Sequence, residues 1–276
     1  MLAALIIVFR EVFEAGLIVG IILAVTRTVP HRNRWVVGGV AAGAAGAALV
    51  AAFAGAISTL FAGMGQELFN AAILGIAVLM LTWHNVWMAH HGRELAGEVL
   101  ATGRAVAEGS KSLLALAVVV GVAVLREGSE VALFLYGVVV GDGNSGLSLL
   151  LGGLLGLALG VAVCLLTYFG LVRIPARPLF RVTTLLIALL AAGMGAQAVA
   201  FLARANWLTT LDNVVWDSSW LLSEDSLVGK AMHTLIGYTD QPTAMQLLVY
   251  VAILLVTFVL MKTVARPANG GAAQPA

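Results

Sequence analysis

Seven apolar stretches, each about long enough to cross a lipid bilayer, occupy most of this chain. A spanning helix needs about 20 mainly apolar residues, and the stretches that meet this length are 2–25, 35–62, 68–91, 112–140, 147–171, 179–203 and 243–262. Hydrophobic residues make up 61% of the sequence and charged residues only 11%, which departs strongly from soluble proteins. We therefore predict an all-α integral membrane protein with seven transmembrane helices, forming one polytopic domain over residues 1–276.

The positive charges outside these stretches predict the orientation. Lys and Arg are enriched in short cytoplasmic loops, and here they concentrate in the connections 26–34, 92–111 and 172–181 and in the C-terminal tail. The alternate connections hold only Arg204 and Lys230, together with most of the remaining acids. The N-terminus should lie outside and the C-terminus inside the cell (inner) membrane, with an outer loop at 204–242 and the last helix at 243–262.

Two copies of the pattern Arg-Glu-x-x-Glu lie within the first and fourth apolar stretches. Their members are Arg10, Glu11, Glu14, Arg126, Glu127 and Glu130. Each charge inside a membrane costs about 2.5–3.5 kcal/mol on insertion scales, so something must offset these charges. Side chains three and four residues apart share one face of a helix, which lets each arginine pair with one carboxylate while the second carboxylate faces the bundle interior.

The two triads are open to more than one interpretation. Each could be an internally paired salt bridge that only orders the bundle, and buried glutamates could also relay protons. The second carboxylate in each copy favours an ion site, because pairing needs only one per arginine. Four carboxylates and two guanidiniums leave a formal charge of −2.

The residue types restrict the ligand of such a site. Carboxylate oxygens suit hard cations such as Mg, Ca and Mn, and by the same logic ferric iron. The single cysteine, Cys164, excludes an internal thiolate cluster, and a net charge of +1 gives no basic surplus for nucleic-acid binding. The spacing does not choose among the hard cations.

The triads also predict internal symmetry. Three helices separate the first triad from the second, and an odd number of crossings inverts the direction of the chain. This predicts two inverted three-helix repeats, at about 1–91 and 112–203, with a site near the midplane. Glycines at four-residue spacing in the second stretch (Gly39, Gly43) and in the fifth (Gly152, Gly156) predict close helix packing.

The motifs together resemble a known family. Besides the two triads, the sequence has Gln66-Glu67-Leu68-Phe69 opening the third stretch, Leu81-Thr82-Trp83 within it, and an outer-loop run from Trp216 to Ser226 followed by Gly237-Tyr238 and Pro242. In these features it resembles the oxidase-dependent ferric iron permease family, and its bacterial EfeU-type branch in particular. It departs from that family's frequent Gly-Leu between the two glutamates, with Val12-Phe13 in the first triad and Gly128-Ser129 in the second.

The resemblance implies a transporter and not an enzyme. It implies that iron is the transported substrate, with no permanently bound cofactor, and that it moves as Fe(III) after oxidation by an extracytoplasmic oxidase or peroxidase partner acting with an iron-binding protein. It assigns Glu11, Glu14, Glu127 and Glu130 as metal ligands, with Arg10 and Arg126 as their charge partners. A proton-coupled carrier of another hard divalent metal, such as Mn or Fe(II), is the alternative.

Two further residue groups are weaker candidates for metal contact. The acids of the outer loop, with Glu67 at the mouth of the third helix, are either a capture site or simply solvated; the loop residues concerned are Asp217, Glu224 and Asp225. His84 and His91, near the predicted inner end of the third helix, are either exit ligands or interface anchors. The Ala/Gly/Pro-rich tail at 267–276 should be disordered.

The predicted orientation can be tested with a reporter fused after Ala276. A reporter that is active only in the cytoplasm should be active there, because the positive charges place the C-terminus inside. A fusion in the outer loop after Trp207 serves as the matched control and should be inactive. An extracytoplasmic reading at Ala276 would contradict the seven-helix topology.

Overall fold

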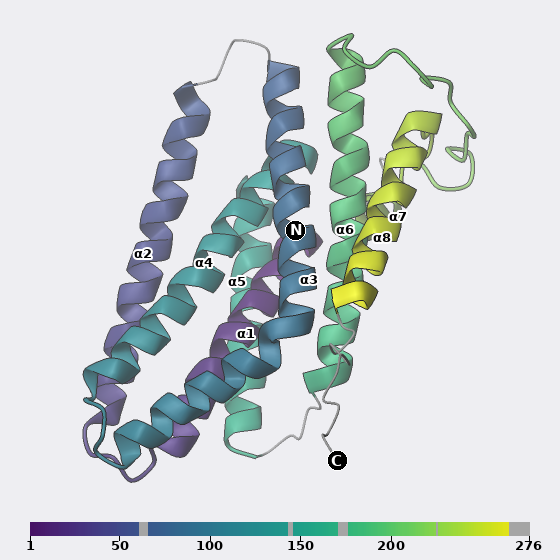
Figure 1. Ribbon diagram of the computed structural model, residues 1–276. Coiled ribbons are helices and arrows are strands. Elements are labelled where there is room, and N and C mark those ends of the chain that lie inside the picture. Colours follow the sequence, from purple (N-terminus) through teal and green to yellow (C-terminus); the bar gives the residue numbers. More distant parts are fainter. Residues whose placement is uncertain (61–65, 143–145, 171–175, 225, 265–276) are drawn as a thin grey trace, which may run out of the picture.

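The computed structural model describes residues 1–60, 66–142, 146–170, 176–224 and 226–264, and the regular elements in this part of the chain are helical apart from one isolated bridge between Val214 and Thr243. In chain order the helices are α1 (Leu2–Val25), α2 (Arg32–Leu60), α3 (Gln66–Ala107), α4 (Leu114–Asp142), α5 (Gly146–Tyr168), α6 (Ala176–Arg204), α7 (Leu227–Ile236) and α8 (Ala244–Val264) (Figure 1). Seven of these helices follow the seven apolar stretches closely. Asp225 and the tail 267–276 lie outside the described residues.

Two helical segments go beyond the apolar stretches. α3 continues to Ala107, and it changes direction on the way (Figure 1). The continuation is polar on one side, but Val99 and Val106 are buried against α1, α2 and α4, so packing extends the helix past the end of its apolar run. α7 lies within the outer loop, where the Ser226 hydroxyl caps its first turn and Gly237, in the left-handed conformation, ends it.

Among the described residues, five helices contain a segment that is apolar and long enough to cross a membrane, namely α2, α3, α5, α6 and α8. α1 and α4 have the necessary length, but each carries the three charges of its triad near its centre. Successive long helices alternate in direction, with α1, α3, α5 and α8 running down the view and α2, α4 and α6 running up (Figure 1). The protein is a multi-pass helical membrane protein. The count of seven crossings, the inverted repeats and the orientation remain predictions.

The glycine-rich helices pack against the triad helices in a reciprocal way. α2, from the first predicted repeat, packs along α4 from the second, and α5 packs along α1. A Cβ atom on Gly43 would lie 2.5 Å from the carbonyl oxygen of Gly121, and one on Gly156 would lie 2.5 Å from that of Leu5. The glycines therefore let pairs of backbones approach more closely than any side chain would permit.

The charged residues form a polar layer between two apolar clusters. One cluster gathers Ile7, Leu81, Phe134 and neighbouring residues of α6. The other gathers Ile22 of α1 with residues of α2, α3 and α4 on the opposite side of the triads. In α1 the triad lies between Ile7 and Ile18, so apolar packing closes the polar layer from both directions.

The close approach of α5 to α1 predicts a position-specific effect of one methyl group. Gly156→Ala should destabilise the protein by about 1–3 kcal/mol, because its Cβ meets backbone atoms that cannot move aside. Gly153→Ala is the matched control, since its Cβ meets only Val8 Cγ2, at 3.9 Å, and alanine favours the helix by up to about 1 kcal/mol over glycine. Thermal unfolding in detergent measures both. Equal unfolding midpoints would show that the contact does not limit packing.

Candidate metal centre

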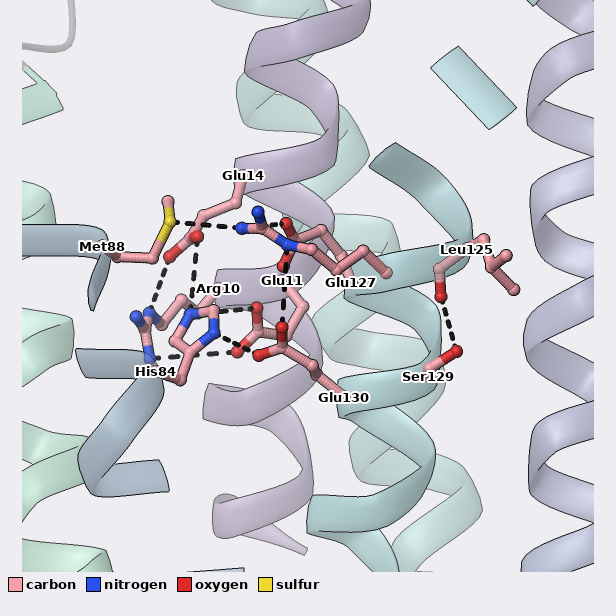
Figure 2. Close-up of polar contacts among 10 residues, drawn as sticks. Arg10, Glu11, Glu14, His84, Met88, Leu125, Glu127, Ser129 and Glu130 are labelled. Atoms are coloured by element: carbon pink, nitrogen blue, oxygen red, sulfur yellow. Dashed lines mark hydrogen bonds and ion pairs between the residues drawn. The ribbon is translucent and has the colours of Figure 1, made fainter. Parts of the chain in front are cut away.

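The four glutamates of the two triads converge where α1, α3 and α4 meet. Figure 2 shows side chains from these three helices pointing toward one another, with Glu11 and Glu14 from α1 and Glu127 and Glu130 from α4. Glu11, Glu14 and Glu127 are buried, with 1%, 3% and 2% of their surface exposed. Ionised carboxylates this deeply buried need partners, so the polar contacts around them determine what the site can do.

Arg10 pairs chiefly with Glu14, one turn further along α1. Its Nε donates to Glu14 Oε1 at 2.8 Å, while its terminal nitrogen lies 3.9 Å from Glu11 Oε1. Arg10 itself is only 1% exposed. The first triad is thus a sealed ion pair that leaves the second carboxylate, Glu11, without a direct guanidinium bond.

Arg126 pairs chiefly with Glu127, the next residue in the chain, and not with the glutamate one turn further along α4. One terminal nitrogen lies 2.9 Å from Glu127 Oε1, and Nε lies 3.7 Å from Glu130 Oε1. The guanidinium also donates to Met88 Sδ at 3.2 Å and lies 4.6 Å from the ring centre of Trp87. Its side chain is 31% exposed. The two triads match in sequence but differ in partner and in burial.

His84 of α3 lies between the two triads. Its Nδ1 contacts Glu130 Oε2, and its Nε2 lies 3.6 Å from Glu14 Oε2 and 3.9 Å from Glu11 Oε2. The ring is 5% exposed and packs edge-on against Phe134. His84, which the sequence predicts together with His91 as an exit ligand or an interface anchor, lies among the carboxylates of both triads.

The geometry offers a ready set of metal ligands. Among the described residues, Glu11, His84, Glu127 and Glu130 each offer one ligand atom, and these atoms all lie within 4.8 Å of one another. Both oxygens of Glu11 and Oε2 of Glu127 accept no hydrogen bond from the described part of the chain. Buried acceptors of this kind are rare in folded proteins, and a bound cation is one way to satisfy them. Glu14, whose Oε1 is held by Arg10, lies beside this set.

A polar neighbour of His84 was also missed by sequence reasoning. Asn85 is 2% exposed, and neither its amide nitrogen nor its amide oxygen has a hydrogen-bond partner among the described residues. Adjacent His and Asn in an otherwise apolar helix were the available signal, since polar residues at membrane depth usually face the bundle interior.

The other candidate residues are held by separate partners. Glu67 pairs with Arg204 at 3.2 Å. Asp217 accepts hydrogen bonds from the Ser219 hydroxyl, the Ser219 backbone N–H and Gln241, which hold the pKa of its carboxyl below the usual value. The structure therefore engages these two acids with separate partners.

Glu224 and His91 have local partners as well. Glu224 Oε1 lies 3.1 Å from His233 Nδ1 of α7, and His233 also contacts Gln197 of α6. His91 stacks on Trp87, and its Nδ1 lies 3.3 Å from the Trp87 carbonyl oxygen. Glu224 thus belongs to the contacts that tie the outer loop to α6, and His91 to the contacts within α3.

Three of the four residues that depart from the family pattern, Val12, Gly128 and Ser129, are engaged in contacts other than those of the centre. A Cβ on Gly128 would lie 2.6 Å from Ala47 of α2, and the Ser129 hydroxyl donates to the Leu125 carbonyl at 2.6 Å (Figure 2). In α1, Val12 fills the space beside Gly160 of α5. The departures therefore concern helix packing and leave the charged positions unchanged.

Comparison with known proteins shows which family the chain belongs to. The chain matches the Iron permease FTR1 family over residues 1–267. It is 34% identical over 268 residues to the ferrous iron permease EfeU of Escherichia coli O6:H1, covering 94% of this chain and 96% of that protein. It is 32% identical to the protein of that name from Shigella sonnei, over 91% of each chain, and 30% identical to that from Yersinia pestis, over 99% and 97%. No solved structure matches the chain.

The family match spans both triads, the helix that carries His84 and the outer loop, so it covers every element of the site described above. The sequence motifs and the helical membrane architecture agree with it. The chain belongs to the Iron permease FTR1 family.

Proposed function

We propose that this protein moves iron across the cell (inner) membrane through the centre formed by Glu11, His84, Glu127 and Glu130. The observation that carries the proposal is the convergence of these ligand atoms within 4.8 Å, in a buried layer between two apolar clusters. Glu14 serves as the partner that keeps Arg10 in place, and both arginines limit the negative charge when the centre is empty.

The ligand chemistry supports a transition metal over Ca or Mg. Carboxylates alone suit all hard divalent cations, whereas imidazole nitrogen suits Fe, Zn, Cu and Ni. A centre that combines three carboxylates with His84 therefore favours iron among the cations that carboxylates accept. Cu(I) prefers thiolate and thioether ligands, and these four ligands include neither, so we expect the centre to bind Cu(I) weakly.

Two oxidation states of iron are candidates for the ion in the centre. The motif resemblance implies Fe(III), produced by an extracytoplasmic oxidase or peroxidase that acts with an iron-binding protein. The charge balance favours Fe(II): with a neutral His84, four carboxylates and two guanidiniums leave −2, which one divalent ion neutralises. Fe(III) would leave a buried charge of +1. We therefore put Fe(II) first for the ion at the centre, where it would bind without a preceding oxidation step.

Transport through this layer requires that the ion exchange water for carboxylates at the site and regain water beyond it. Opposite charges interact strongly in a low-dielectric layer. Release of the ion is therefore easier from the side of the centre where the charged side chains are more exposed. Arg126, with its side chain 31% exposed, marks that side.

Iron uptake into proteoliposomes tests the proposed site and the oxidation state together. We compare Fe(II) under reductant with an Fe(III) chelate, for the parent protein and for Glu11→Gln with Glu130→Gln, which removes one charge from each triad helix. Uptake by the double variant should fall about tenfold or more, because two carboxylate ligands lose their charge and a loss of about 1.4 kcal/mol in binding already corresponds to a factor of ten.

Glu108→Gln, on the exposed turn after α3, is the matched control and should transport like the parent. Equal insertion of all proteins is verified by protease protection. Equal uptake by the double variant and the control would return the glutamates to a structural role. Uptake of the Fe(III) chelate alone would reverse the order of the two oxidation states.

A further inference from the structure

Two cavities adjoin the metal centre at successive positions along α3 and α4. The first, of about 250 Å³, is lined by His84 and Glu130 together with aromatic residues of α3 and α4. The second, of about 270 Å³, is lined by Glu127 together with Glu98 and Thr102 of the α3 continuation. Glu130 and Glu127, two ligands of the same centre, thus face different cavities.

The order of the cavities follows from the directions of the two helices. The first cavity takes its lining from α3 residues 80–87 and α4 residues 126–134, and the second from α3 residues 95–102 and α4 residues 118–127. α3 and α4 run in opposite directions (Figure 1). The second cavity therefore lies between the centre and the α3–α4 connection, which the positive charges assign to the cytoplasm.

Arg126 lines both cavities and so lies where they adjoin. Its guanidinium is 2.9 Å from Glu127, facing the second cavity, and its Nε is 3.7 Å from Glu130, facing the first. A fixed positive charge at this point opposes passage of a cation. Arg10, the equivalent residue of the first triad, is 1% exposed and lines neither cavity.

We propose that Glu98 is the first ligand that a metal cation meets after leaving the centre toward the cytoplasm, and that Arg126 is the barrier it passes. A shift of the guanidinium from Glu127 toward Glu130 frees Glu127 to face the second cavity, where the Glu98 carboxylate and the Thr102 hydroxyl supply oxygen ligands. The cation class is that of the centre, and this proposal rests on the proposed transport function.

The continuation of α3 beyond its apolar stretch positions Glu98 at the second cavity. Its apolar side packs through Val99 and Val106, and these contacts fix the register that directs Glu98 at the second cavity. Among the described residues, Glu98 forms no ion pair or hydrogen bond, in contrast to the carboxylates of the centre. A carboxylate without a fixed partner is suited to transient binding.

The test compares Glu98→Gln with Glu94→Gln, which lies one turn earlier on the same helix, is exposed, and is outside the lining of the cavity. The initial rate of Fe(II) entry into proteoliposomes, read by an entrapped fluorescent chelator, should fall about tenfold in Glu98→Gln. It should be unchanged in Glu94→Gln and largely restored in Glu98→Asp. Mn(II) binding to the solubilised protein should be the same in all four proteins.

The outcomes separate this proposal from the proposed function. Equal rates in Glu98→Gln and Glu94→Gln would overturn the exit role of Glu98. Loss of Mn(II) binding in Glu98→Gln would also overturn it, because Glu98 would then act on the centre itself. A parent protein that neither binds Mn(II) nor admits Fe(II) would instead refute the transport function on which the exit route depends.

Discussion

The burial of charged side chains within an apolar helical bundle is the constraint on which the rest of this structure depends. Removing one partner from a buried ion pair costs about 3–5 kcal/mol, because the other charge is left uncompensated. Arg10 with Glu14 is such a pair within α1, whereas Arg126 with Glu127, within α4, is partly exposed. His84 of α3 joins the two helices, because it contacts Glu14 of α1 and Glu130 of α4. α1, α3 and α4 must therefore meet at one level, and the glycine contacts of α2 and α5 hold α4 and α1 in the positions that allow it.

The two triads share a sequence pattern, yet the structure gives them different environments. Arg10 holds the more distant glutamate of its triad and is sealed, whereas Arg126 holds the nearer one and borders two cavities. The difference arises because α3 crosses both triad helices and supplies Trp87, Met88 and His84 to the space between them. A symmetric motif thereby has one buried side, at Arg10, and one side that borders two cavities, at Arg126.

Much of this arrangement could be predicted from the sequence. Apolar runs predict the helix positions because each helix in lipid must satisfy its own backbone hydrogen bonds. The triads indicate a functional site because charged side chains within membrane helices are costly and rare. The pairing of each arginine with one carboxylate was also predicted and is confirmed by the contacts of Arg10 and Arg126.

Other features depend on packing that a linear pattern does not encode. His84 beside tryptophans resembles an interface anchor in sequence, and only the crossing of three helices reveals that it lies among the carboxylates. The continuation of α3 beyond residue 91 rests on the burial of Val99 and Val106. The outer acids are close in sequence, but Asp217 and Glu224 take different local partners.

The most direct test of this account is X-ray absorption at the iron edge of the protein loaded with Fe(II), for the parent, His84→Gln and His91→Gln. If the centre binds iron as described, the parent spectrum contains imidazole scattering together with oxygen ligands. That imidazole signal is lost in His84→Gln and kept in His91→Gln. An imidazole signal that persists in His84→Gln, or a parent spectrum with oxygen ligands alone, would contradict the claim that His84 and the glutamates form one iron site.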